Sequence, residues 1–373
     1  MITFGGSVAS NAATRGGGDQ GNTTESHAGV SEDVMRNQQR LGELTSWIVQ
    51  QPTVTDSGYI SQVNDAENLA ARLLWHGHDE LLNSALTKAS ELGISVTVEQ
   101  RPQSLTEIEA VATKLLDARQ SFADVGFEIT GVQGVAAETS DLVVLGVSTG
   151  HARSSGNAAQ DVATAAAEIA RTLTQAPTRI SMEGGDIALT NGSRVAPTPP
   201  YWAGSALQRY LAPTTDICSS GFSVLYDGSP RVTTARHCDS YPYTGPNGQG
   251  DFGTSIATST DGALRVLSAT GGPRMFDGPW NVGANTGLDK GLYGLYDVGL
   301  NDWVCVSGAS SGSHCTLKVT AMYVYINDGY GTVSTISATQ QTAGQIAIAE
   351  GDSGGPVFMI TFRRATITSA LSG

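Results

Sequence analysis

Apolar residues in the first half of the chain recur with the spacing of amphipathic helices. One set is separated by three, four or seven positions: Val34, Leu41, Leu44 and Ile48. A second set forms another apolar face: Leu82, Leu86, Ala89 and Leu92. Asp79 is the expected cap of this second helix, and Gly93 is its expected end. A third helix is predicted to begin at a capping box made by Ser104 and Glu107.

Between these helices, apolar residues alternate with polar ones or form short runs, which is typical of strands. The expected strands are 58–63, 69–75, 94–98, 127–129 and 142–147. Helices and strands mixed in this way predict a small α+β domain over residues 31–197. Residues 1–30 are rich in Gly, Ser, Thr and Asn without any period, so a disordered low-complexity segment is expected there.

The pattern changes after the Pro-rich segment 196–201. From there to the end, Gly, Ser and Thr separate short β-branched or aromatic runs, such as 222–226, 263–267 and 319–326. Few of these segments sustain a helical period. Residues 198–373 are therefore predicted to form an all-β sandwich or barrel.

Composition and charge narrow the class of protein. The 373 residues suffice for two domains, and a charged fraction of 15% with 45 glycines is typical of a β-rich extracellular protein. The net charge of −14 argues against a nucleic-acid partner, and no run approaches the roughly 20 apolar residues of a membrane span. Residues 1–20 lack the basic start and apolar core of a secretory signal, so the true start of the gene is expected to be missing or mis-called.

All four cysteines lie between positions 218 and 315 and group in two pairs. Cys218 is close in sequence to Cys238, and Cys305 to Cys315, and neither pair has the C-x-x-C spacing of a zinc or redox motif. Two short-range disulfides are the simplest interpretation, each worth about 3 kcal/mol on the chain-entropy model. Buried free thiols are the alternative.

Two segments carry candidate chemistry. Residues 351–356 read GDSGGP, a glycine-crowded turn that presents the hydroxyl of Ser353. A serine needs a base and an oxyanion site to act as a nucleophile. The N–H groups of Gly351 and Ser353 are candidates for that site, at about 3 kcal/mol per donor. His237, followed directly by Cys238, is the candidate base, and a disulfide to Cys218 would fix the backbone that aims its imidazole.

These segments resemble those of a known family. TARHC at 234–238 and GDSGGPVF at 351–358 are similar to the hallmark segments of chymotrypsin-fold serine proteases. The closer resemblance is to the actinobacterial secreted streptogrisin and α-lytic type, whose opening strand resembles 218–224 and whose short disulfide loop resembles 305–315. The resemblance covers about 200–360. It implies a double Greek-key barrel, a secreted enzyme and a polypeptide substrate.

The same resemblance implies a precursor. Members of this type carry an N-terminal pro-domain that assists folding or inhibits the enzyme and is then cleaved away. That role would suit the α+β domain 31–197, ahead of a protease domain at 198–373, with cleavage expected between about 195 and 215.

The third member of the triad is a choice among aspartates, because the family's mechanism uses a buried carboxylate to orient the imidazole. Asp261 precedes a short apolar run and fits best, while Asp297 is the rival and Asp251 is interpreted as part of a turn. The expected triad is His237, Asp261 and Ser353. No metal or cofactor is expected, and the histidines at 76 and 78 are interpreted as a solvated turn rather than as metal ligands.

Several positions depart from the family pattern. Only 20 residues follow Ser353, so the barrel is expected to be truncated at its C-terminus. Arg236 replaces a small residue before the histidine. Val306 stands where several relatives carry an Arg that pairs with the Asp before the nucleophile, so Asp352 is expected to lack a partner. The alternative hypotheses are a catalytically inactive, truncated protease-like binding protein, and a main role for 31–197 as an inhibitor or folding assistant.

Overall fold

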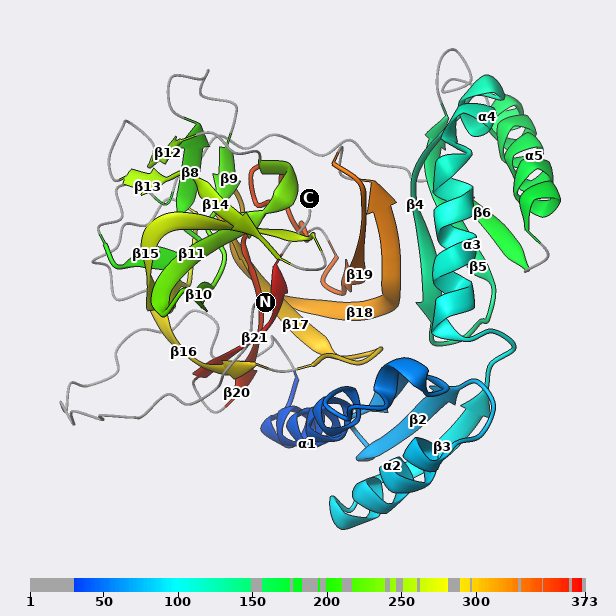
Figure 1. Cartoon of the computed structure of the whole chain (residues 1–373), viewed down its shortest axis with the longest axis horizontal. Helices are drawn as coiled ribbons and strands as arrows, with labels where there is room; N and C mark the ends of the chain where they lie inside the picture. The colour runs from blue at the N-terminus through cyan, green and yellow to red at the C-terminus, as the bar shows by residue number, and fades with distance from the viewer. Residues whose placement is uncertain are drawn as a thin grey trace.

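The computed structural model describes residues 30–148, 156–174, 177–182, 194, 199–209, 217–238, 242–245, 251–259, 262–280, 289–295, 297–327, 330–343, 345–361 and 364–370. Over these residues the chain is mostly β-strand with a few helices (Figure 1). The described residues up to 182 are called the N-terminal half, and those from 199 the C-terminal half. The predicted disorder of residues 1–30 falls outside the described part of the chain, apart from residue 30.

The N-terminal half begins with two helices packed on a small sheet. Its elements are α1 (Glu32–Val49), η1 (Val54–Asp56), β1 (Tyr59–Asp65), β2 (Ala70–Trp75), α2 (Glu80–Glu91) and β3 (Ser95–Gln100). Strand β2 pairs antiparallel with β1 and parallel with β3. Asp79 caps α2 by accepting a hydrogen bond from Leu82 N at 2.9 Å, and Gly93 follows the helix with φ of +67°, as the sequence predicted. The apolar faces of both helices are buried against the sheet.

A second layered unit follows. Its elements are α3 (Leu105–Asp117), α4 (Arg119–Asp124), β4 (Phe127–Ala136), β5 (Leu142–Ser148), α5 (Gly156–Leu173) and β6 (Thr178–Met182). The capping box of Ser104 and Glu107 at the start of α3 is confirmed. Figure 1 shows α3, α4 and α5 beside the sheet β4–β5–β6. The sequence did not predict α5, because the residues it buries include the small Ala166 and Ala170, which give a weak periodic signal.

The C-terminal half is built from strands. They are β7 (Tyr201–Ala203), β8 (Ala206–Arg209), β9 (Ile217–Ser219), β10 (Ser223–Tyr226), β11 (Ser229–Ala235), β12 (Tyr243–Thr244), β13 (Asp251–Gly253), β14 (Ser255–Thr258), β15 (Leu264–Phe276), β16 (Asp289–Leu295), β17 (Trp303–Gly308), β18 (Gly312–Asn327), β19 (Thr332–Gln340), β20 (Pro356–Thr361) and β21 (Arg364–Ala370). One apolar cluster of this half gathers around Phe252 and Leu267, and another around Met275 and Phe358. The predicted all-β character is confirmed for the described residues.

Both predicted disulfides are present. Cys218 and Cys238 are joined with an S–S distance of 2.07 Å, and Cys305 and Cys315 with 2.05 Å. No cysteine is free, so the alternative of buried thiols is wrong. None of the helices in the described residues has the length and apolar character needed to cross a membrane.

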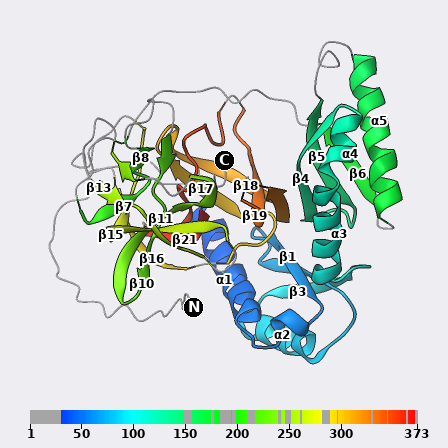
Figure 2. The ribbon, with the colours of Figure 1, turned by 45° about the horizontal axis from the view of Figure 1, so that its top comes forward.

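The two halves share one sheet and one apolar core. Strand β4 pairs antiparallel with β18, with Val132 opposite Tyr325, so the sheet of the N-terminal half continues that of the C-terminal half (Figure 1). A second contact joins β1 to the segment before β17, where Asn64 N donates to Leu300 O at 2.8 Å. Figure 2 shows α1 between the small sheet and the β-rich half. There the buried Gln38 donates to Trp303 O at 2.9 Å.

Candidate active site

The turn that carries Ser353 depends on two glycines in the left-handed region. Gly351 has φ of +94° and Gly354 has φ of +87°, and residues other than glycine rarely adopt these backbone angles. A Cβ at Gly354 would lie 2.4 Å from Thr234 Oγ1 and 2.6 Å from Ala235 N. The turn therefore packs directly against the end of β11, and no larger residue fits there.

The carboxylate of Asp352, next to Ser353, is fully buried and accepts four hydrogen bonds. Asp352 accepts hydrogen bonds from Ala349 N at 2.7 Å, Ser310 N at 2.9 Å and Ser311 N at 3.0 Å. It also accepts one from Ser311 Oγ at 2.5 Å. The expectation that Asp352 lacks a partner was wrong. The 309–311 turn between β17 and β18 supplies the donors that an Arg at 306 would otherwise provide.

The segment of His237 lies beside this turn. His237 is in the 3₁₀ helix η3 (Arg236–Cys238), which follows β11 directly. The chain distance from Cys238 to Ser353 is 115 residues, yet Cys238 Sγ lies 3.7 Å from Ser353 O. Ser219 N donates to the same oxygen at 2.7 Å. Because Cys218 precedes Ser219 and is bonded to Cys238, the disulfide links strand β9 to both segments.

Ser219 is a residue that the sequence analysis missed. Its hydroxyl donates to Gly351 O at 2.8 Å and accepts from Ala309 N at 2.8 Å. It therefore joins the turn of Ser353 to the turn that holds the buried carboxylate. The available signal was its position directly after Cys218, since the disulfide that places Cys238 also places Ser219.

Asp261 lies outside the described residues, but the chain on either side of it is placed. Ala263 O accepts a hydrogen bond from Arg236 N at 3.0 Å, and Gly262 N donates to Ser259 O at 2.9 Å. The segments that flank Asp261 are thus bonded to the histidine turn and to each other. This placement supports Asp261 and leaves its assignment a prediction.

The two other aspartates have different surroundings. Asp297 is exposed, and its N–H donates to Ser46 Oγ of α1 at 3.4 Å, so it faces the N-terminal half. Asp251 was interpreted as part of a turn, but it begins strand β13, where its exposed carboxylate accepts a hydrogen bond from Gly253 N at 2.8 Å. Neither has the buried position that a triad carboxylate needs.

Arg236 has a structural role that the sequence did not indicate. Its guanidinium donates to Gly331 O at 3.0 Å, and its own carbonyl accepts from Arg265 Nε at 2.6 Å. The guanidinium of Arg265 lies 5.1 Å from the ring of Tyr330. The chain at 330–331, between β18 and β19, is therefore tied to the histidine turn.

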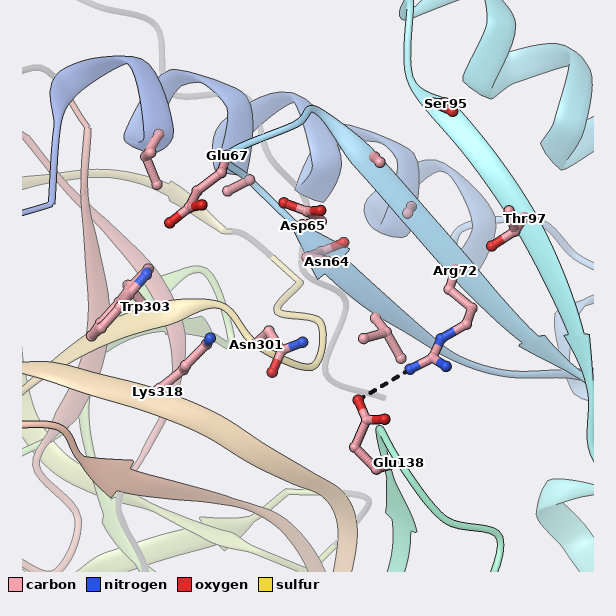
Figure 3. A pocket seen from close by; sticks show the side chains of 15 residues that line it. Asn64, Asp65, Glu67, Arg72, Ser95, Thr97, Glu138, Asn301, Trp303 and Lys318 are labelled. Atoms are coloured by element: carbon pink, nitrogen blue, oxygen red, sulfur yellow. Dashed lines mark hydrogen bonds and ion pairs between the residues drawn. The ribbon is translucent and has the colours of Figure 1, made fainter.

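A groove lies elsewhere, between the two halves. Its volume is about 480 Å³, and its lining includes Asp65, Arg72, Trp303 and Lys318 (Figure 3). It includes no residue of the Ser353 turn or of η3. The groove has charged residues of both signs and no nucleophile paired with a base.

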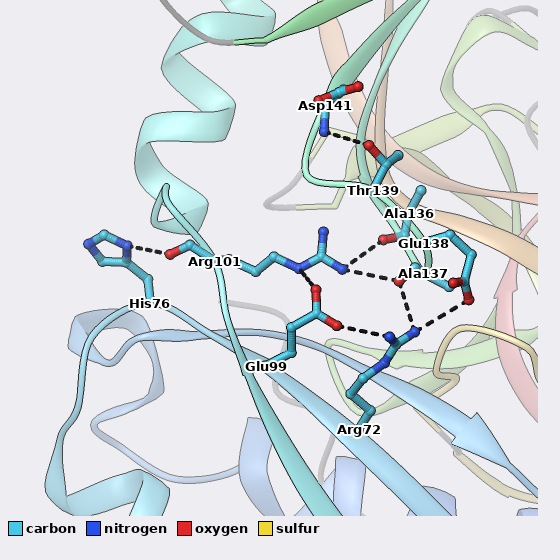
Figure 4. Close-up of polar contacts among 9 residues, drawn as sticks. All are labelled: Arg72, His76, Glu99, Arg101, Ala136, Ala137, Glu138, Thr139 and Asp141. Atoms are coloured by element: carbon cyan, nitrogen blue, oxygen red, sulfur yellow. Dashed lines mark hydrogen bonds and ion pairs between the residues drawn. The ribbon is translucent and has the colours of Figure 1, made fainter.

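A polar cluster joins the two units of the N-terminal half (Figure 4). Glu99 pairs with Arg72 and with the buried Arg101, each at 2.9 Å. Both arginines also donate to Ala137 O, which follows β4. His76 Nδ1 lies 3.0 Å from Arg101 O. Among the described residues, no group of three His, Cys, Asp or Glu side chains is arranged to hold a metal ion.

One buried acid lies at the contact between the halves. Asp302 Oδ1 accepts from Asn64 Nδ2 at 2.7 Å, and its Oδ2 accepts from Gly299 N at 2.7 Å. Burial raises the pKa of Asp302 from 3.8 to about 7, although both hydrogen bonds act in the opposite direction.

Comparison with known proteins gives matches in structure only. No protein-family model matches the chain, and no curated protein matches its sequence. The chain is similar to a glutamic acid specific serine protease, with a TM-score of 0.35 and 24% identity, over 46% of this chain and 85% of that chain. Thermobifida fusca protease A matches with a TM-score of 0.33 and 23% identity, over 46% of this chain and 84% of that chain.

Cellulomonas bogoriensis chymotrypsin matches with a TM-score of 0.31 and 24% identity, again over 46% of this chain and 84% of that chain. These solved structures are bacterial chymotrypsin-like serine proteases. TM-scores below 0.5 leave the activity of this chain to be argued from its own residues.

Proposed function

We propose that the chain is the precursor of a secreted, chymotrypsin-like serine endopeptidase. The observation that carries the proposal is the contact between the turn of Ser353 and the segment of His237. Ser353 O lies 3.7 Å from Cys238 Sγ, and Gly354 packs against Ala235, two residues before the histidine. A nucleophile and its base must be brought together in this way.

The proposed reaction is acyl transfer to water. Ser353 Oγ attacks a peptide carbonyl while His237 takes its proton, and His237 then protonates the leaving amine. Asp261 orients the imidazole, and the N–H groups of Gly351 and Ser353 stabilise the oxyanion. A water molecule, deprotonated by the same histidine, releases the acyl-enzyme. The substrate is a polypeptide bound in an extended conformation along a strand edge.

The surroundings of Ser353 suit this chemistry because they hold the turn rigidly. The four hydrogen bonds to Asp352 and the two made by Ser219 Oγ fix the backbone directly before Ser353. Preformed N–H donors stabilise an oxyanion without reorganisation at the moment of reaction. The two disulfides favour an oxidising, extracellular compartment.

The N-terminal half is proposed to be the pro-domain, with the domains assigned as 31–197 and 198–373. Its strand β4 extends the sheet of the C-terminal half through β18, and the apolar residues of both halves form one cluster. A unit that supplies a neighbouring strand and part of a core favours the folded form of its partner. These contacts support a role as a folding assistant, and the same unit is proposed to inhibit the enzyme until it is cleaved away.

The test is covalent labelling with a fluorophosphonate after oxidative folding of the full chain. Ser353→Ala and His237→Ala are expected to abolish labelling, and Asp261→Asn to slow it by about 10⁴-fold. Asp297→Asn, the matched control at the rival aspartate, is expected to label like the parent protein. A folded parent protein that does not label would contradict the proposal and favour the catalytically inactive, protease-like binding protein.

A further inference from the structure

Arg194 lies in the connection between the two halves, and its side chain is completely buried in the C-terminal half. Its Nη1 donates to Phe276 O at 3.1 Å and to Ser307 Oγ. Its Nη2 donates to Gly278 O at 2.7 Å and to Ser313 Oγ at 3.1 Å. The planar fork thus connects the end of β15 to β17 and β18, an arrangement that a single ammonium group cannot reproduce.

The acidic side chains near Arg194 complement its positive charge. Asp277 and Asp352 are both buried, and their negative charges favour the protonated guanidinium. Burial lowers the pKa of Arg194 to about 10, which leaves the side chain charged at neutral pH. Lys290 pairs with Asp277 at 3.0 Å.

Arg194 also contacts the backbone segment against which the turn of Ser353 packs. Ser307, whose hydroxyl it contacts, precedes Gly308, and a Cβ at Gly308 would lie 2.1 Å from Asp352 Oδ1. A Cβ at Gly355 would lie 2.6 Å from Ser307 O. The turn of Ser353 therefore rests on the 307–308 backbone, and Arg194 holds the Ser307 side chain at that position.

We propose that Arg194 is a positioning residue of the proteolytic half, and that maturation therefore cuts the chain before Arg194. This inference rests on the proposed function. It moves the domain boundary from 197/198 to a position before Arg194, and it places the cut upstream of the 195–215 window expected from the sequence. A cut after Arg194 would release the guanidinium together with the pro-domain. Two carbonyls and two hydroxyls would each lose one hydrogen bond, and Asp352 would lose its nearby cation in a buried site, which is destabilising.

The position of the cut is tested without relying on catalysis. In the full chain carrying Ser353→Ala, a recognition sequence for an added site-specific protease is inserted either just before or just after Arg194. Both uncut proteins must melt like the parent protein. Cleavage before Arg194 is expected to leave the melting temperature of the C-terminal half unchanged, whereas cleavage after it lowers that temperature by about 10 °C. Equal effects of the two cuts would overturn the proposal.

The positioning role is tested by labelling kinetics in the chain that retains Ser353. Arg194→Met is expected to lower the maximal labelling rate by about 10-fold or more, leaving the probe concentration for half-maximal rate unchanged. Arg194→Lys is expected to recover part of that rate, and Arg179→Met, an exposed arginine of the N-terminal half, to lose none.

Unchanged maximal rates in folded Arg194 variants would reject the positioning role. The N-terminal residue of the matured species, read by mass spectrometry, is expected at or before Arg194. A start after Arg194 in a species that labels fully would also overturn the inference. A parent protein that never labels would instead count against the proposed function, while the inserted-site experiment would still decide where Arg194 belongs.

Discussion

Asp302 is expected to make the unfolding free energy of the chain depend on pH, and one substitution isolates this effect. The native pKa, about 7, lies above the ordinary value of 3.8, so the folded protein binds more protons than the unfolded chain between these values. The stability linked to Asp302 is therefore full below about pH 4, falls as pH rises, and is constant above about pH 7. A difference of about three units at about 1.36 kcal/mol each amounts to about 4 kcal/mol.

The informative variant is Asp302→Asn in the Ser353→Ala background, which prevents self-cleavage. Asn cannot ionise, and its amide nitrogen faces one of the two donors, Asn64 Nδ2 or Gly299 N. At pH 4, where the parent protein has a protonated Asp302, that mismatch makes the variant less stable than the parent by about 1–3 kcal/mol. The parent protein should lose about 4 kcal/mol more than the variant between pH 4 and 7.

The assay is thermal and urea unfolding of both proteins at half-unit steps from pH 4 to 8. The difference between their unfolding free energies is the measured quantity, because every other titrating group is common to both. Asp297→Asn, an exposed acid in the same region, controls for the change in net charge. Parallel curves for the parent protein and Asp302→Asn would refute the reasoning, since they would show that burial does not perturb Asp302.

Three further variants test the geometry around Ser353. Gly354→Ala is expected to lower the unfolding free energy by more than about 3 kcal/mol and to abolish labelling. The control is Gly228→Ala, which is also at positive φ but in open space and is expected to cost about 1 kcal/mol. Equal melting temperatures for the two variants would contradict the packing argument. The double variant Cys218→Ser with Cys238→Ser should lose about 3 kcal/mol and slow labelling. Unchanged labelling would show that the disulfide does not place the histidine. Asp352→Asn is expected to cost about 3 kcal/mol because its amide nitrogen faces N–H donors, and a variant that melts like the parent protein would disprove the buried carboxylate.

The features that the sequence predicted correctly are local. The cap at Asp79 and the capping box at Ser104 and Glu107 depend on residues within four positions of each other. Each disulfide likewise joins cysteines that are close in sequence, 20 and 10 residues apart. The candidate nucleophile and base stay predictions, and each was proposed because it lies in a short, distinctive segment.

The features that were missed depend on contacts between distant segments. The donors to Asp352 are mainly backbone N–H groups of residues 310, 311 and 349, and every amino acid except proline has such a group. Residue identity therefore could not reveal them. Arg194 is a single cation in a segment of small residues and proline, and its burial depends on a pocket formed by β15, β17 and β18. The pairing of β4 with β18 joins the edges of two sheets, one from each half, and these edges are adjacent only after both halves have folded.

The contact between the halves is suited to being released. Around β1 it uses Gln38, Asn64 and Asp302, which bond across the boundary at 2.7–2.9 Å and can be rehydrated after separation. An entirely apolar boundary would leave a large exposed patch on the separated C-terminal half. Because the environment created by this contact raises the pKa of Asp302, the joined state binds a proton that the separated state releases near neutral pH. By linkage, a rise in pH from about 4 to 7 weakens the contact, so a cut precursor should lose its N-terminal half more readily at neutral pH than in acid.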